Sequence, residues 1–600
     1  MAIDSTRLKG LPCALPLLCC GWLLTAAVPC DARDPAAVSE EEEPIDLVMF
    51  HDPQLKIGDV QLALPDGLKE LWLKAIDRGD SELQQLAADS FALAQQRGMK
   101  DLEDTHSRLA DLLKVPKQDL VVHRAAVHTL VHLDARDYAK LLAETAKVHG
   151  LTTSLVVEPA LARWKSDIMK DEWLSRIDNP RASLAARILA IDGLGETEEA
   201  KAVNSLKRIT VNLRLIANER MAAARALSKM RAPGLVSEAT TLIGTKSQPT
   251  LLNTVLALEL LQTEDSQDAV ALLEGLASHD STAVQSGALQ RLYAIDPKHV
   301  CGFAESAIKS KDAGVRTVGA RTLIVQKKGK LIAPLATLLD DVNPTLRRHV
   351  ARAFVQLASE PTLHEEVIKQ TTAVLNRDQW RGIEQAVIVL VSLDHKPAGD
   401  RFVELMQHSR GEVKSASAWG LRRLALPVHL PAMLARAHEL YDGIRSDAIP
   451  LTVPGVDLQS TQLFLAFGQM RYMDAEPLLM HYVPKDHTLG VFSRCAAIWS
   501  VGLLHEGKAP ADLTATLIER LSDVMSMEPE DDRVRRMSAI SIGRMKSESA
   551  VATIRKFATD DSGYVQRSCY WALEQLTGET PPPLDTFLLK ITDWFLVPIR

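Results

Sequence analysis

A nine-residue pattern recurs along most of this chain: an apolar residue, a small residue four positions later, and another apolar residue four positions after that. Copies run from Leu83 to Val565 at intervals of about 31 to 41 residues. The clearest copies are Val284-Ala288-Leu292, Val315-Gly319-Leu323, Leu346-Val350-Phe354, Val413-Ser417-Leu421, Val534-Ser538-Ile542 and Val565-Cys569-Leu573. A period in this range is typical of stacked helical units, each of which contacts only its neighbours.

The spacing indicates that each repeat is a pair of helices. The three positions lie at about 0°, 40° and 80° around a helix, so they form one narrow apolar stripe whose small middle residue admits a neighbouring helix. A second apolar segment follows each motif after a short break, for example Leu331 to Leu339. Asp312 and Asn343 precede motif helices as N-caps. We therefore predict an all-α solenoid of about 13 or 14 helix pairs.

Composition restricts the class of protein. A length of 600 residues is more than one compact core usually holds, and 46% hydrophobic with 24% charged residues fits a folded chain. The formal net charge is -8, which argues against a nucleic-acid binder because phosphate contacts need clustered Lys and Arg.

The first 32 residues differ from the rest. Arg7 and Lys9 precede an apolar run from Leu11 to Val28, and small residues lead to Ala32, which is the order of a cleavable secretory signal. An uncleaved anchor is one alternative, and a lipoprotein modified at Cys30 is another. A continuous spanning helix is weakened by Pro12, Pro16 and Pro29. Pro29 also lies directly before Cys30, where it fits the lipoprotein site poorly. We predict export by a cleaved signal, with no membrane span in the mature chain.

Three cysteines lie outside this leader, namely Cys301, Cys495 and Cys569. Cys495 and Cys569 fall in motif helices two repeats apart, which places them about 20 Å apart for helices stacked at about 8 to 10 Å. A disulfide requires Cα atoms within about 7 Å. We therefore predict no disulfide and three buried thiols.

The chain divides into six segments. The leader covers residues 1–32, an acidic linker with a small irregular or extended N-terminal cap covers 33–66, and the first repeats cover 67–149. Residues 150–177 read as an inserted segment, 178–578 as the main solenoid, and 579–600 as a proline-rich break followed by an apolar tail. We expect the tail to cover the exposed flank of the last repeat; a docking peptide for another protein is the alternative.

Two stretches of the main solenoid carry a recognisable signature. Asp312 to Ala320 reads Asp-x-x-Val-Arg-x-x-Gly-Ala, which resembles the signature of HEAT repeats, and Asp561 to Leu573 is a second copy. The short period is similar to that of lyase-type HEAT-like repeats, and the chain resembles secreted bacterial HEAT-repeat proteins over about residues 68–578. This resemblance implies that the motif helices line the concave surface of the solenoid.

The resemblance also raises an enzymatic alternative. Deoxyhypusine hydroxylase, a HEAT-repeat enzyme, binds iron through His-Glu pairs at equivalent repeat positions. This chain has three such pairs, but they are out of register: His364-Glu365, His438-Glu439 and His505-Glu506. His128 and His132 have a usable metal spacing, yet no carboxylate is fixed nearby, so we interpret them and His123 as partly exposed histidines. With no phosphate-loop, nucleophile or zinc-protease motif, we predict a non-enzymatic protein without catalytic, cofactor-binding or metal-binding residues.

The clearest binding signal comes from the motif helices. Counted from the first apolar residue of the motif, positions +2 and +6 point away from the apolar stripe. They hold Trp and Arg, the residues most enriched in binding hot spots. The partner-binding candidates are Trp419, Trp499, Trp571, Arg321, Arg348, Arg352 and Arg536. Two alternatives stay open: the tryptophans could fill seams between repeats, and the arginines could form Asp–Arg ladders.

We expect an exported, non-enzymatic scaffold that binds a protein or peptide partner on its concave surface. One alternative is a HEAT-type enzyme or lyase-like factor that acts on a protein-bound cofactor. A structural component of the cell envelope is the other.

Overall fold

The computed structural model describes residues 45–55, 60–244, 250–583, 587–590 and 594–596. The chain divides into two units, residues 1–46 and 47–600, and the second holds all of the described residues except 45 and 46. The predicted signal and the acidic run therefore lie outside the described residues. Among the described helices, none is both long and apolar enough to cross a membrane.

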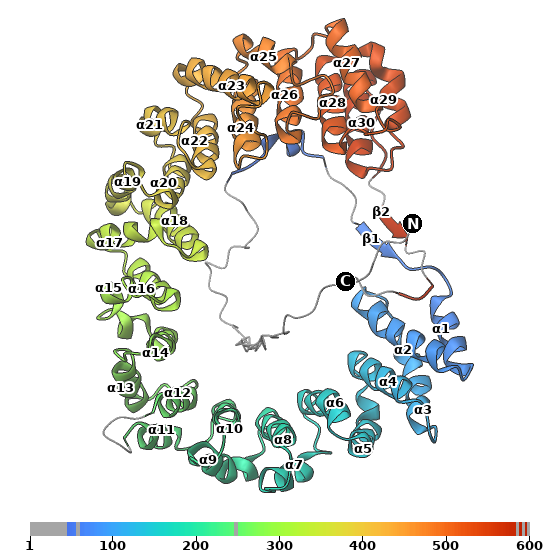
Figure 1. Cartoon of the computed structure of the whole chain (residues 1–600), viewed down its shortest axis with the longest axis vertical. Coiled ribbons are helices and arrows are strands. Elements are labelled where there is room, and N and C mark those ends of the chain that lie inside the picture. Colours follow the sequence, from blue (N-terminus) through green and yellow to red (C-terminus); the bar gives the residue numbers. More distant parts are fainter. Residues whose placement is uncertain (1–44, 56–59, 245–249, 584–586, 591–593, 597–600) are drawn as a thin grey trace, which may run out of the picture. The chain divides into compact units, whose positions relative to one another are not determined.

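The described part of the second unit is an all-α solenoid, as predicted. It contains 30 α-helices, which pack as consecutive pairs in two rows (Figure 1). The even-numbered helices, here called the motif row, are α2 (Ser81–Gln96), α4 (Leu120–His132), α6 (Leu151–Arg163), α8 (Leu184–Glu196), α10 (Ala217–Lys229), α12 (Leu251–Leu260), α14 (Thr282–Ile295), α16 (Ala313–Val325), α18 (Pro344–Ala358), α20 (Trp380–Ser392), α22 (Gly411–Leu424), α24 (Val456–Gln469), α26 (Val491–Leu504), α28 (Asp532–Met545) and α30 (Gly563–Thr577). The odd-numbered helices form the second row: α1 (Leu68–Asp77), α3 (His106–Lys114), α5 (Ala139–His149), α7 (Lys170–Ile177), α9 (Val203–Val211), α11 (Leu235–Gly244), α13 (Gln267–Leu276), α15 (Ala304–Ala307), α17 (Ile332–Ala336), α19 (Pro361–Leu375), α21 (Gly399–Leu405), α23 (Leu430–Arg445), α25 (Glu476–Met480), α27 (Ala511–Ser522) and α29 (Val551–Phe557).

The sequence motif acts as expected in this packing. Val315 is fully buried on α16, and a Cβ atom on Gly319 would lie 2.9 Å from the Cβ of Ala307 in the preceding helix. The predicted N-caps are also present, since the side chain of Asp312 accepts from Val315 N at 2.9 Å and that of Asn343 from Leu346 N at 3.0 Å. These bonds satisfy first-turn amides that have no partner inside the helix.

Residues 150–177 are not an insertion. They hold α6 and α7, and α6 packs between α4 and α8 like any other motif helix. Its motif reads Thr153-Val157-Leu161, so the first position is polar, and Pro159 lies inside the helix. A search for two apolar residues around a small one therefore misses this repeat, and the described helices make fifteen pairs rather than 13 or 14.

The close approach of motif helices gives a stability test. A Cβ atom on Gly468 of α24 would lie 2.5 Å from Ser500 Oγ and 2.8 Å from Ser500 Cα on α26. We expect Gly468→Ala to lower the free energy of unfolding by about 1–3 kcal/mol, because the packed helices must separate. Gly275 of α13 is the control, since it is exposed and meets nothing within 4 Å. Gly275→Ala should raise stability by about 0.5–1 kcal/mol. Urea unfolding followed by circular dichroism measures both, and equal effects of the two substitutions would contradict this account of the packing.

The C-terminal tail does not cover the last repeat. Strand β2 (Phe587–Lys590) pairs in parallel with strand β1 (Val60–Ala63), which precedes the first helix. Trp72 of α1 donates from Nε1 to the Trp594 carbonyl at 2.7 Å, and Leu596 is buried in the core that Trp72 joins. The tail is therefore a lid for the first helices, because β1 offers it a free edge and α1 an apolar face.

The three described cysteines are free thiols, but only two of them are buried. Cys301 is exposed, which corrects the prediction, because it directly follows a short 3-10 turn at Pro297–Val300 instead of lying inside a helix. Burial raises the pKa of the Cys495 thiol and raises that of Cys569 to about 12.

Thiol reactivity should separate these cysteines. We expect a maleimide at neutral pH to modify Cys301 in the folded protein and to reach Cys495 and Cys569 only after denaturation, since the thiolate is the reactive form. Peptide mapping by mass spectrometry reads each site separately. Modification of Cys495 at the rate of Cys301 in folded protein would contradict the packing of α26.

Candidate peptide-binding surface

The structure places the seven predicted binding residues in three kinds of surroundings. Arg321, Arg348 and Arg352 are exposed on α16 and α18. Trp571 of α30 is half-buried against Gly543 of α28, and Trp419 of α22 is buried. Trp499 and Arg536 are also buried, and both donate hydrogen bonds to one short segment of the chain.

That segment is Val48–Asp52, here called the N-terminal segment. It contains a 3-10 turn, η1 (Val48–Phe50), and lies against α26 (Figure 1). Helices α26 and α28 reach it because positions +2, +6 and +10 of a motif helix share one face, at about 200°, 240° and 280°. This is the face that carries Arg536, Trp499 and Arg544.

Side chains of the motif row donate to the backbone of this segment. Arg536 donates to the Phe50 carbonyl at 2.7 Å. Trp499 Nε1 donates to the Asp52 carbonyl at 3.1 Å, and Arg544 donates to the same carbonyl at 3.0 Å. Carbonyl groups two residues apart are thus held by three donors on two helices.

Two side chains of the segment are held by apolar or aromatic contacts. Met49 is completely buried. The Phe50 ring packs edge-on against Phe492 of α26 with centroids 6.3 Å apart, an arrangement that aromatic pairs favour. The Arg536 guanidinium lies 5.7 Å from the Phe50 ring and 5.2 Å from that of Tyr564.

The electrostatics of the surface favour an acidic ligand. Burial lowers the pKa of Arg544 and of Arg536, and for Arg544 the nearby Asp52 carboxylate acts in the opposite direction. Arg544 pairs with that carboxylate at 2.6 Å. Among the described residues, no carboxylate pairs with Arg536, and Arg536 Nε and one terminal nitrogen of Arg544 make no hydrogen bond. Of these two buried guanidinium groups, only Arg544 has a carboxylate partner within the described residues.

Sequence reasoning found part of this surface. It selected Trp499 and Arg536, but it missed Arg544, which lies at position +10 of the same motif helix and could have been found by extending the +2 and +6 series. It also missed Met49, Phe50 and Asp52, because no local pattern marks a segment that binds repeats far along the chain.

A buried ion network links α26 to α27 and to the loop before α28. Glu530, in the loop before α28, accepts from Arg494 of α26 at 2.8 Å and 3.0 Å and from Arg520 of α27 at 3.4 Å. Its side chain has no exposed surface. The acidic loop at 525–532 therefore contains a structural carboxylate that fixes α26 to its neighbours.

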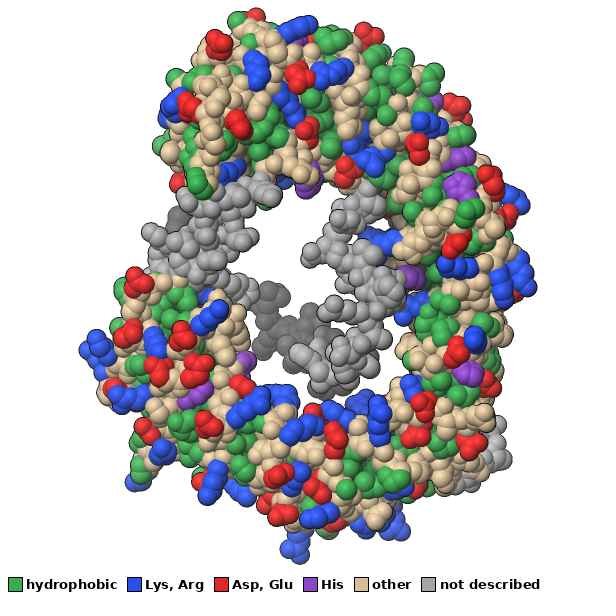
Figure 2. All heavy atoms as spheres, turned by 180° about the vertical axis from the view of Figure 1, so that it is seen from behind, with side chains coloured by type: hydrophobic (Ala, Val, Ile, Leu, Met, Phe, Trp, Pro, Cys, Tyr) green, Lys and Arg blue, Asp and Glu red, His purple; other side chains and the backbone are tan. Residues whose placement is uncertain are grey.

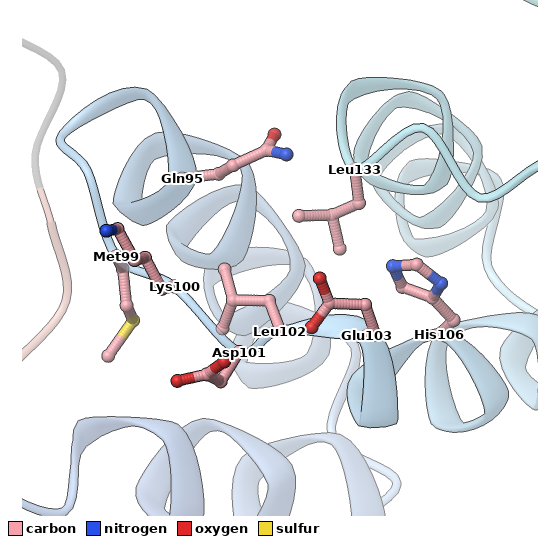
Figure 3. A pocket seen from close by; sticks show the side chains of 8 residues that line it. All are labelled: Gln95, Met99, Lys100, Asp101, Leu102, Glu103, His106 and Leu133. Carbon is pink, nitrogen blue, oxygen red and sulfur yellow. The ribbon is translucent and has the colours of Figure 1, made fainter.

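One pocket bears on the enzymatic alternative. It has a volume of about 350 Å³ and lies where α2 and α3 are connected (Figure 3). Its lining is Gln95, Met99, Lys100, Asp101, Leu102, Glu103, His106 and Leu133. Asp101 lies on the other side of Leu102 from Glu103 and His106 (Figure 3), and burial lowers the pKa of His106 against the effect of Glu103. Asp101 is therefore not grouped with Glu103 and His106 in this pocket.

Within the described part of the chain, the histidine cluster lacks the further ligands that a metal site needs. His128 and His132 lie together with ring centroids 4.6 Å apart, but His123 is buried against His149, 4.5 Å away, rather than partly exposed. Over the described ranges, no group of three or more His, Cys, Asp or Glu residues could hold a metal ion. Figure 2 shows Lys and Arg side chains interspersed with Asp and Glu on the face it displays.

Comparisons with known proteins agree with this architecture. Residues 518–594, which include α28 and α30, match the family model described as HEAT repeats. No curated protein matches the sequence. The structure described as "Kap95p Binding Induces the Switch Loops of RanGDP to adopt the GTP-bound Conformation" has a similar fold, with 12% identity, a TM-score of 0.51, and coverage of 85% of this chain and 72% of that chain.

Two further solved structures are more distant. Importin beta in an ammonium sulfate condition is 14% identical, with a TM-score of 0.48 and coverage of 85% of this chain and 72% of that one. The karyopherin Kap121p bound to the extreme C-terminus of the protein phosphatase Cdc14p is 12% identical, with a TM-score of 0.47 and coverage of 86% and 57%. At these identities the likeness concerns the fold alone.

Proposed function

We propose that this HEAT-repeat protein is a non-enzymatic scaffold that binds a protein or peptide partner along its motif row, the surface that the HEAT resemblance implies is concave. The observation that carries this proposal is the N-terminal segment on α26 and α28, whose Phe50 and Asp52 carbonyls accept bonds from Trp499, Arg536 and Arg544. Bonds to main-chain carbonyls do not depend on the ligand's side chains, so the same donors suit other extended peptides.

The physical form of the surface supports this function. Trp499 and Arg536 are held in packed helices before any partner arrives, so little conformational freedom is lost when a ligand binds. Kap95p, whose fold is similar, binds RanGDP in its solved structure. A solenoid of this type is therefore a suitable scaffold for a protein partner.

We also propose that the protein acts after export. The order of basic, apolar and small residues in 1–32 supports this. N-terminal sequencing of the protein from its source should find a mature chain that begins at Arg33 or Val28. A chain that retains Met1 would contradict cleavage.

Site-specific photo-cross-linking tests the scaffold function. A photoreactive amino acid replaces Arg352, which is exposed in the motif row, and in a matched variant it replaces Lys369, which is exposed on α19 in the second row. The full-length variants are illuminated in extracts of the source cells and their envelope. We expect a cross-linked partner from position 352 and none from position 369. A partner cross-linked only from position 369, or none from either, would contradict binding along the motif row.

A further inference from the structure

We propose that the N-terminal segment is the chain's own copy of the motif by which its partner binds. This inference rests on the proposed function and gives the chemistry of the partner: an extended peptide with a large flexible apolar residue, an aromatic residue next to it, and a carboxylate two residues after the aromatic one. Such a peptide competes with Met49, Phe50 and Asp52 for α26 and α28.

The carboxylate follows from the charge of the surface. Arg544 is only 8% exposed as a side chain, and its ion-pair partner is Asp52. A buried guanidinium that loses its partner is strongly destabilised. Any ligand that replaces the N-terminal segment must therefore bring its own acidic group to Arg544.

The spacing between the aromatic and the acidic residue of the peptide follows from the bonds to its backbone. Arg536 binds the carbonyl of Phe50, and Trp499 with Arg544 binds that of Asp52. Asp52 therefore offers Arg544 both its carbonyl and its carboxylate. This double contact fixes the acidic residue two positions after the aromatic one.

The apolar positions follow from burial. Met49 has no exposed surface, and Phe50 is half-buried between Phe492 and the guanidinium of Arg536. Methionine adapts to irregular apolar surroundings, so this position selects size more than shape. His51 and Gln54, by contrast, are exposed, so the surface does not select the residue types at these two positions.

The segment is suited to exchange because the solenoid is complete without it. Helices α24, α26, α28 and α30 pack against one another directly, and the N-terminal segment lies on the face of α26 and α28 that carries Trp499, Arg536 and Arg544. As part of the same chain it competes at a high effective concentration. The surface is thus occupied until a partner with the same chemistry displaces the segment.

Binding in trans tests the proposal in the full-length protein. The probe is a fluorescent synthetic peptide of residues 45–54, titrated by anisotropy into the wild type and into a Phe50→Ala, Asp52→Ala variant. We expect the variant, whose own segment is weakened, to bind at least about tenfold more tightly than the wild type. Adding Arg544→Met to the variant should abolish binding, whereas adding Lys369→Met on α19, which lies in the second row, should leave it unchanged.

Three results would overturn the proposal: equal affinity for wild type and variant, retention of binding with Arg544→Met, or equal binding of a probe with asparagine at position 52. Circular dichroism verifies that each variant keeps its helices. If the double variant does not fold, Asp52→Asn alone takes its place, because this change removes only the charge.

The proposed function and this inference fail in different ways. If a partner is cross-linked from position 352 and excess peptide 45–54 does not displace it, the scaffold stands and the inference is wrong. If the peptide binds as expected but no partner is cross-linked, the binding chemistry is confirmed and the proposed function is contradicted.

Discussion

Replacing Glu530 with alanine should lower the free energy of unfolding of the C-terminal repeats by about 3–5 kcal/mol. The substitution removes the carboxylate between Arg494 and Arg520, whose side chains are 3% and 10% exposed. Both guanidinium groups would then remain buried without their partner. Native-state hydrogen exchange of α26, α27 and α28 is the appropriate measurement, since repeats of a solenoid can unfold separately.

Glu519→Ala is the matched control. Glu519 lies 3.8 Å from the same Arg520, but its side chain is 70% exposed, and an exposed pair contributes about 1 kcal/mol or less. A loss of similar size in both variants would show that the buried network does not hold α26 in place.

Arg544→Met should release the N-terminal segment. The change removes the ion pair to the Asp52 carboxylate and the bond to its carbonyl while keeping a long apolar side chain. We expect the amides of residues 47–55 to exchange hydrogen roughly tenfold faster or more, which corresponds to about 1.4 kcal/mol. Hydrogen–deuterium exchange followed by mass spectrometry measures this directly.

The neighbouring Arg471 provides the comparison. It binds Glu506 and the Leu503 carbonyl, and no hydrogen bond links it to the N-terminal segment in the described structure. Arg471→Met should leave exchange of residues 47–55 unchanged. Equal acceleration in both variants would mean that general loosening of α26, and not the loss of a specific contact, frees the segment.

Much of the fold was predictable because it is local. A helix motif that begins at Val315 and is capped by Asp312 describes α16 almost completely. The repeat that contains α6 was missed because Thr153 replaces its first apolar residue. The pairing of Val60 with Phe587 was also missed, because contacts between opposite ends of a chain leave no periodic signal.

Only the helical residues of the candidate site were predictable from the sequence, and the residues of the N-terminal segment were not. Repeat phase selected Trp499 and Arg536, since a fixed face of each motif helix points away from its core. It could not select Asp52 or Phe50, because these residues contact Arg544 and Phe492, which are more than 400 positions away in sequence. Partner binding stays a prediction for all seven selected residues, because the contacts of Trp499 and Arg536 are with the chain's own N-terminal segment.

Cross-linking from position 50 tests the central claim most directly, namely that this face of α26 and α28 binds an extended peptide. Phe50 is replaced by benzoylphenylalanine in the full-length protein, which is illuminated, digested and mapped by mass spectrometry. We expect intramolecular cross-links to peptides that contain Phe492, Arg536 or Tyr564, and their loss when peptide 45–54 is added in excess. Cross-links that fall mainly on other helices, or that excess peptide does not reduce, would contradict the claim.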